Sequence, residues 1–261
     1  MARLLRCGEV CFNRGVPIDL TCLGTADAFG SAGRHCAGYL VETPEAGLLV
    51  DAGPSVLVAL KAFGRTSESI DAVVLSHLHG DHFGGIPFLL LEYTYDTPRN
   101  RPLTIVGPPG TERRIFELYR ALYRESAEHG VPFELRFVEL DGGGIHEIGD
   151  VRIEAFRVPH QEKAVSLGHR LRTPDKTFVY SGDTAWTPDL LHQSRGADLF
   201  LCECSTFSSS VPRHVRYLDI DANRNDFECR KLLLTHLGRE IRSYRSEIQD
   251  ELATDGLRVK L

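Results

Sequence analysis

The 261-residue chain has no apolar run near the roughly 20 residues that a membrane-spanning helix needs. Its first residues also lack an apolar stretch of signal-peptide length. These two absences predict a cytoplasmic protein with no membrane partner. An apolar content of 42% with 25% charged residues is ordinary for a globular protein, and the length allows one large domain or two small ones.

The sequence has no excess of positive charge, since its formal net charge is −6. Proteins that hold extended nucleic acid usually carry a basic surface, so extended nucleic acid is not the expected partner. A small molecule or a short nucleotide fits this charge better. A phosphodiester remains compatible with it, because bound metal ions can supply positive charge locally.

The seven cysteines are odd in number and form no CxxC pair. Most of them lie in or near apolar stretches, which predicts buried free thiols. Cys7 and Cys11 have a spacing that could hold a metal, but no second pair accompanies them.

From Pro17 onward, short apolar runs alternate with helical patterns. The patterns predict strands at 18–23, 38–41, 48–50, 103–106, 151–158, 164–171, 177–180, 199–201 and 232–234, and helices at 55–63, from after His82 to 91, 111–128, 188–193 and 240–248. The alternation of apolar and charged residues in 151–158 shifts by one position at Ala155-Phe156, which predicts a β-bulge. This order favours an α/β sandwich of two sheets covered by helices. We expect residues 1–16 to form a tail or an edge strand and residues 17–261 to form one domain.

Four potential metal ligands fall within six residues, His77-Leu78-His79-Gly80-Asp81-His82, directly after the apolar run 72–75. One strand and one turn therefore present three imidazoles and a carboxylate to one small volume. These groups suit zinc and similar divalent ions. Four ligands so close in sequence cannot easily converge on one ion, so the motif suggests two metals that share a site.

Other apolar runs also end directly before a residue that can bind metal. These residues are Asp51, His160, Asp183, Glu203 and His236. Ligand sites in α/β proteins collect beyond the carboxyl ends of strands. A lone His or Asp at such a position is more often a surface or capping residue. The cluster at 77–82, however, needs partners to complete two coordination shells.

With Leu23-Gly24-Thr25, these motifs resemble the metallo-β-lactamase superfamily of hydrolases, in the family's order and over about residues 17–237. The segments 101–110 and Glu203-Cys-Ser-Thr-Phe207 are similar to one branch, the tRNA 3′-processing endonucleases (RNase Z) and related small phosphodiesterases. The resemblance implies an αββα sandwich, in which two mixed sheets are flanked by helices and the metals lie at one edge.

The resemblance also implies two divalent metal ions, with Zn²⁺ as the first choice and Mn²⁺, Fe²⁺ or Ni²⁺ as alternatives. When the family's ligand positions are matched to this sequence residue by residue, the first ion would be bound by His77, His79 and His160. The second would be bound by Asp81, His82 and His236, and Asp183 would bridge the two.

Further roles follow from the same resemblance. Asp51 would orient a ligand histidine. Glu203 and His214 match a proton-donating pair of the RNase Z-like branch. Arg213 and Arg216 flank His214 and could hold a phosphate, although a solvated loop is an equally simple interpretation. Proteins of this branch are often homodimers, so a homodimer is also considered.

The leading hypothesis is a dinuclear metal-dependent phosphodiesterase that acts on a small or nucleotide-like diester. A hydroxide shared by the two metals would attack phosphorus, Asp81 and Asp183 would position it, and His214 would protonate the leaving group. One alternative is an acyl hydrolase of the same fold that acts on a thioester or a lactone. A degenerate family member that serves only as a binding module is another.

An RNase Z-type tRNA 3′ endonuclease is the remaining alternative. RNase Z enzymes grip tRNA with a long arm inserted between the ligands that match His160 and Asp183. Here only the 22 residues 161–182 separate those two positions, which leaves room for two strands and no arm.

Overall fold

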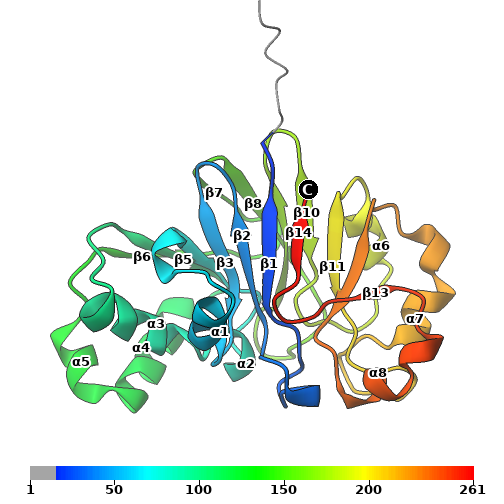
Figure 1. Cartoon of the computed structure of the whole chain (residues 1–261), viewed down its shortest axis with the longest axis horizontal. Helices are drawn as coiled ribbons and strands as arrows, with labels where there is room; N and C mark the ends of the chain where they lie inside the picture. Colours follow the sequence, from blue (N-terminus) through cyan, green and yellow to red (C-terminus); the bar gives the residue numbers. More distant parts are fainter. Residues whose placement is uncertain (1–15) are drawn as a thin grey trace, which may run out of the picture.

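Two seven-stranded sheets pack face to face in residues 16–261, the part of the chain described by this computed structural model (Figure 1). The strand orders are β14-β1-β2-β3-β4-β5-β6 and β13-β12-β11-β10-β9-β8-β7. Each sheet is mixed: β3 to β6 and β10 to β13 are parallel, whereas the other neighbours are antiparallel. The predicted αββα sandwich is confirmed.

In the first half, three strands come before the first α-helix, and in the second half four strands, β7 to β10, come before the next one; helices then separate most of the strands that follow. The strands are β1 Asp19–Gly24, β2 Gly38–Glu42, β3 Gly47–Ala52, β4 Ala72–Val74, β5 Leu103–Gly107, β6 Leu135–Glu139, β7 Ile145–Ile148, β8 Val151–Arg157, β9 Leu167–Arg172, β10 Thr177–Tyr180, β11 Leu199–Glu203, β12 Leu232–Thr235, β13 Glu251–Leu252 and β14 Arg258–Lys260. The helices are α1 Val56–Ala62, α2 Gly80–Phe83, α3 Ile86–Leu91, α4 Thr111–Leu122, α5 Arg124–His129, α6 Asp189–Ser194, α7 Tyr217–Ala222 and α8 Arg239–Ser243.

The main hydrophobic core lies between the two sheets and takes residues from strands of both. Two further clusters pack the helices against the outer faces, with α1, α3 and α4 on the first sheet and α6, α7 and α8 on the second (Figure 1). Strands β3 and β11 are buried along their whole length, as their continuous apolar sequences require.

The predicted bulge at Ala155-Phe156 is wrong. Strand β8 pairs without interruption with β9, Ala155 with His169 and Phe156 with Gly168. Ala155 joins the core between the sheets, and Phe156 packs on the helix-covered face instead. Gly168 makes room for this ring, since a Cβ there would lie 2.2 Å from Phe156 Cζ. The apparent change of phase therefore reflects apolar side chains on both faces of one regular strand.

Three other expectations also needed correction. The helix expected at 111–128 is two helices that part at Tyr123, whose ring packs edge-on against Phe88 at 5.9 Å. The helix expected after His82 begins earlier, at Gly80, so that α2 contains Asp81 and His82. The sequence patterns also missed β6, β7, β13, β14 and α7.

The expected tail or edge strand, with Cys7 and Cys11, falls mainly on residues 1–15 and so lies outside the described residues. The five cysteines within residues 16–261 are free thiols, and Cys22, Cys202 and Cys204 are buried. No helix in the described part of the chain is long and apolar enough to span a membrane. One domain over 17–261 stays a prediction.

Candidate metal centre

The carboxyl ends of several parallel strands from both sheets meet at one edge of the sandwich, where their polar side chains converge. Asp51 lies in β3, and the segment 77–82 follows β4 in the first sheet. In the second sheet, Asp183 follows β10, Glu203 ends β11 and His236 follows β12. His160, which follows β8, comes from the antiparallel part of the second sheet. Strand topology thus brings together residues that are up to 185 positions apart, from 51 to 236.

The candidate ligands form two groups, and within each group the ligand atoms all lie within 4.8 Å of one another. The first group consists of His77, His79 and His160. The second group consists of Asp81, His82, Asp183 and His236. Asp183 lies between them. Its Oδ2 is 3.2 Å from His236 Nε2, 3.3 Å from His82 Nε2 and 4.0 Å from the Nε2 atoms of His77 and His160.

The chemistry of these atoms fits divalent metal ions. The Nε2 atoms of His77, His82 and His236 and the Oδ1 atom of Asp183 are buried without a hydrogen-bond partner among the described residues. Buried polar atoms in native proteins nearly always have a partner. Imidazole nitrogen and carboxylate oxygen directed at one volume are the donors that zinc and similar ions accept. The cluster could therefore hold metals, and the assignment of each ligand to one of two ions stays a prediction.

Asp51 fixes the orientation of His82 through a hydrogen bond to Nδ1, the ring nitrogen opposite the one that faces the other candidate ligands. Its carboxylate is fully buried and accepts hydrogen bonds from His82 Nδ1 at 2.7 Å, Tyr180 Oη at 2.9 Å and the Ser76 amide and hydroxyl at 2.8 Å. Because Nδ1 of His82 is held by Asp51, Nε2 faces Asp183 and Asp81. A carboxylate behind a metal-binding histidine is the usual supporting arrangement. The geometry thus agrees with the predicted role of Asp51.

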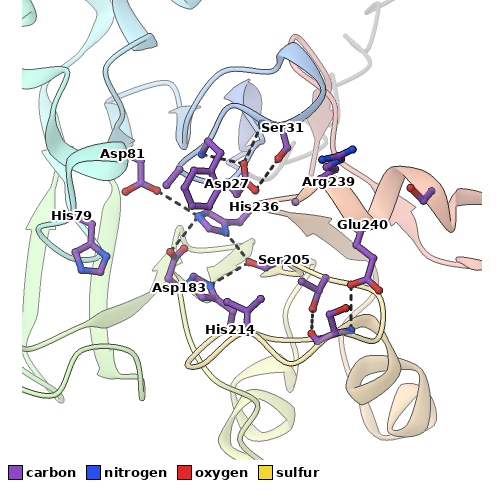
Figure 2. A pocket seen from close by; sticks show the side chains of 17 residues that line it. Asp27, Ser31, His79, Asp81, Asp183, Ser205, His214, His236, Arg239 and Glu240 are labelled. Carbon is purple, nitrogen blue, oxygen red and sulfur yellow. Dashed lines mark hydrogen bonds and ion pairs between the residues drawn. The ribbon is translucent and has the colours of Figure 1, made fainter.

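Ser205 supports the other side of the centre, and its role was missed from the sequence. Its hydroxyl lies 3.1 Å from Nδ1 of His236 and 3.2 Å from Nδ1 of His214 (Figure 2). It also lies 3.1 Å from Glu203 Oε2. The imidazoles of His214 and His236 are stacked, with centroids 5.4 Å apart. One small side chain therefore couples a candidate ligand to the predicted Glu203–His214 pair.

The predicted Glu203–His214 pair is joined by a hydrogen bond in the structure. Glu203 is fully buried, and its Oε1 accepts a hydrogen bond from His214 Nδ1 at 3.1 Å. Thr184 N and Val215 N also donate to the Glu203 carboxylate. His214 is 19% exposed, and its Nε2 takes no part in these bonds. An imidazole held in this way can offer Nε2–H to a bound molecule.

The buried carboxylates draw positive charge toward this edge. Burial disfavours a charged His236, but the charges of Asp183 and Glu203 and the hydrogen bond to Asp81 together outweigh burial and raise the pKa to about 9. For His77, burial dominates and the pKa falls well below its ordinary value. Burial also opposes the charge of His214, yet the hydrogen bond to Glu203 raises its pKa. Carboxylates thus surround His236 closely, and His214 is suited to carry a proton.

Arg213 and Arg216 do not turn toward this centre. The guanidinium of Arg213 pairs with Glu162, and that of Arg216 pairs with Asp219 at 2.6 Å. Neither lines the cavity beside the centre. The expectation that they hold a phosphate therefore has no geometric support, because each is neutralised by a neighbouring carboxylate. Arg213 contributes through its backbone, since its carbonyl oxygen lies 3.1 Å from His160 Nδ1.

A cavity of about 750 Å³ opens beside the ligands (Figure 2). Its wall includes His79, Asp81, Asp183, His214 and His236, together with Phe29 and Arg239, which the sequence patterns did not single out. A cavity of this size can enclose a molecule as large as a nucleotide.

The fold and the ligand cluster define a hydrolase of the metallo-β-lactamase fold. The chain belongs to the family described as anti-Pycsar protein Apyc1, whose family model matches residues 18–254.

Known proteins that resemble the chain agree with this placement. Ribonuclease Z of Lachnospira eligens is 33% identical over 211 residues, which cover 72% of this chain and 67% of that protein. The metallo-β-lactamase fold protein YhfI from Bacillus subtilis matches with a TM-score of 0.76 at 22% identity, over 94% of this chain and 100% of that one. A diphosphatase from the PhnP family matches with a TM-score of 0.75 at 18% identity, over 93% and 97%. The predicted superfamily and its RNase Z-like branch are confirmed.

Proposed function

We propose that this protein is a metal-dependent phosphodiesterase that hydrolyses a small or nucleotide-like diester. The observation that carries the proposal is the Glu203–His214 pair, because its imidazole lines the cavity next to the candidate ligands. A leaving alkoxide needs a proton, whereas the thiolate that leaves a thioester does not, so the pair argues against a thioester but not against a lactone. The similar proteins include a ribonuclease and a diphosphatase, which supports phosphorus as the centre of attack.

The ligands would hold two divalent ions, Zn²⁺ being our first choice. When bound, such ions supply an acidified water as nucleophile and neutralise charge on the phosphate oxygens. Asp81 and Asp183 would orient that water, because both carboxylates line the cavity and lie close to His82 Nε2. His214 would donate the proton of Nε2–H to the leaving oxygen, while Glu203 keeps the imidazole oriented and stabilises its charged form.

The substrate that we propose is small. The 22 residues between His160 and Asp183 include the paired strands β9 and β10, which belong to the sheet, and the short connections beside them leave no room for a protruding arm. The net charge of −6 also gives little attraction to a long polyanion. Both points support a small diester over tRNA as the substrate.

The test compares two leaving groups on otherwise similar diesters. His214→Ala should lower kcat on a cyclic nucleotide, whose leaving alkoxide needs a proton, by about 100-fold. On bis(p-nitrophenyl) phosphate, whose leaving group needs no proton, the loss should be much smaller. His192→Ala, in α6 and outside the cavity, is the matched control and should behave as the wild type.

Equal losses on both substrates would reject His214 as the acid. Turnover of thioesters or lactones by a wild-type protein that hydrolyses no diester would reject the proposed function. Metal content measured on the same samples would show whether His214→Ala changes the bound ions instead.

A further inference from the structure

The two residues that directly precede the ligand turn 77–82 are hydrogen-bonded to the opposite sheet. The carbonyl oxygen of Leu75 accepts a hydrogen bond from His169 Nε2 at 2.9 Å. The carbonyl oxygen of Ser76 accepts one from the Leu167 amide at 2.9 Å. Both acceptors follow β4 in the first sheet, whereas both donors lie in β9 of the second. Facing sheets are about 10 Å apart and are usually joined by apolar side chains. These two hydrogen bonds, the β4–β9 contact, therefore join the sheets in a different way.

His169 is a polar residue in an apolar place. Its side chain is fully buried, and Leu167 and Leu171, two positions away on either side, belong to the hydrophobic core between the sheets. Because a carbonyl oxygen can only accept, Nε2 of His169 carries the proton, and Nδ1 has no partner within residues 16–261. A buried acceptor without a partner costs stability, and a leucine here would avoid that cost. What a histidine adds at this position is the bond to Leu75.

The strand that carries His169 stands between two strands that lead to candidate ligands. β8 pairs with β9 on one side and leads to His160, and β10 pairs with it on the other side and leads to Asp183. The first group takes His160 from this sheet, and His77 and His79 from the turn after β4. These ligands can converge only if the two sheets are held at the right separation. The β4–β9 contact, one and two residues before His77, sets that separation beside the ligands.

Other parts of the centre meet at the same contact. A Cβ on Gly182 would clash with Leu167 O and lie 3.0 Å from Ser76 Cβ, so the segment before Asp183 packs directly on it. The amide and the hydroxyl of Ser76 both donate to Asp51 at 2.8 Å. The end of β4 is thus held from two sides, by Asp51 in its own sheet and by β9 in the other.

The second group has links between the sheets of its own. Tyr39 Oη in β2 lies 2.7 Å from Oγ1 of Thr235, the residue before His236. Tyr180 Oη in β10 donates to Asp51 in β3 at 2.9 Å. Both tyrosines are fully buried. These links would continue to hold the second group when the β4–β9 contact is weakened, so the effect of weakening it should fall on the first group.

We propose that His169 is a positioning residue for the metal ion of the first group. It touches neither an ion nor the substrate. Through the carbonyl oxygen of Leu75, it holds the turn with His77 and His79 at the distance from the second sheet that His160 requires. This role goes beyond the proposed function, because it concerns the assembly of the metal centre and not the molecule that the centre acts on.

The experiment titrates Zn²⁺ into the metal-free protein by calorimetry and compares the Kd values of the two ions. His169→Leu fills the space but donates no hydrogen bond. It should raise the Kd of the first-group ion by about tenfold, the lower end of the range for residues that support metal ligands, and leave the other Kd within about twofold. His169→Gln keeps an N–H near the position of Nε2 and should bind both ions as the wild type does.

A second background assigns the effect to one group. In His79→Ala, only the ion of the second group should bind, so adding His169→Leu should leave its Kd unchanged. If His169→Leu does not fold, His169→Asn replaces it, because the shorter amide cannot reach Leu75 O. The same selective rise in Kd is expected for that variant.

Leu171→Val is the matched control, because Leu171 is fully buried on the same face of β9. It should lower the urea midpoint of the metal-free protein without changing the ratio of the two Kd values. His169→Leu should change the ratio while the midpoint stays close to that of the wild type, because an apolar side chain replaces the unpartnered Nδ1.

Three results would overturn the role of His169. They are an unchanged Kd of the first-group ion, an equal rise of both Kd values together with a lower urea midpoint, and a wild type that binds only one ion. The proposed function fails separately, because the titration measures no turnover. A protein that binds two ions and hydrolyses no diester would reject the phosphodiesterase, and the ratio of Kd values would still decide the role of His169.

Discussion

The two groups of candidate ligands differ in how their side chains are held. In the second group, the side chains of His82, Asp183 and His236 are at most 3% exposed. Asp51 orients His82 and Ser205 orients His236, both through buried side chains. In the first group, His79 is exposed.

The support behind the first group comes from a sequence neighbour and from the backbone. His77 Nδ1 lies 3.0 Å from the hydroxyl of its neighbour Ser76, and His160 is held by the backbone carbonyl of Arg213. Two of the three ligands come from one turn after β4. The second group draws its ligands from three separate segments and depends on contacts between both sheets. We therefore expect the second group to be coupled to the stability of the fold, and the exposed His79 of the first group to be almost independent of it.

The largest expected effect is the loss of one whole ion. His79→Ala should reduce bound metal from two equivalents to one, because three ligands become two in the first group. The unfolding free energy of the metal-free protein should change by no more than about 0.5 kcal/mol, as for other surface substitutions. Elemental analysis and urea unfolding would measure the two quantities, with the exposed His129→Ala as control. Loss of both ions would show that the groups are not separable.

Next in size is removal of the support behind His82. Asp51→Ala should weaken metal binding by about 10–100-fold, the range for such supporting carboxylates. It should also lower the unfolding free energy by about 3 kcal/mol or more, since four buried donors lose their acceptor.

Tyr180→Phe separates the two effects of Asp51. It removes one donor to Asp51 while leaving the bond to His82, so that stability should fall slightly and metal affinity should stay close to the wild type. A metal affinity that is unchanged in Asp51→Ala would contradict the supporting role.

The smallest effect is expected at Ser205. Ser205→Ala should weaken metal binding by about tenfold, the lower end of that range, because the backbone still holds His236 in place. It should also lower kcat on a cyclic nucleotide, since the same hydroxyl contacts His214 and Glu203. Ser194→Ala, a buried serine in α6, is the control for metal titration and turnover. A stronger loss than in Asp51→Ala would reverse the proposed order.

Most of the candidate ligands could be predicted because each comes directly after an apolar run, and strand ends of one sheet edge must meet. The spacing from His77 to His82 is local and needs no tertiary information. Phe29 and Arg239 escaped prediction because they lie in connections whose course is set by contacts with distant segments. The bulge at Ala155-Phe156 was wrong because alternation cannot show that both faces of a strand are buried.

The sequence by itself determined the family, the two-sheet architecture and the set of residues that could bind metal, because these depend on local patterns and on residue chemistry. Only the tertiary structure decided which side chains support them. The resemblance already implied the role of Asp51, but Tyr180 and Ser205 act through contacts across 129 and 31 positions of the chain that the sequence did not show. The tertiary structure also decided that Arg213 and Arg216 face carboxylates while Phe29 faces the cavity. The direction of a side chain from a connecting loop depends on what packs around it, which no local pattern records.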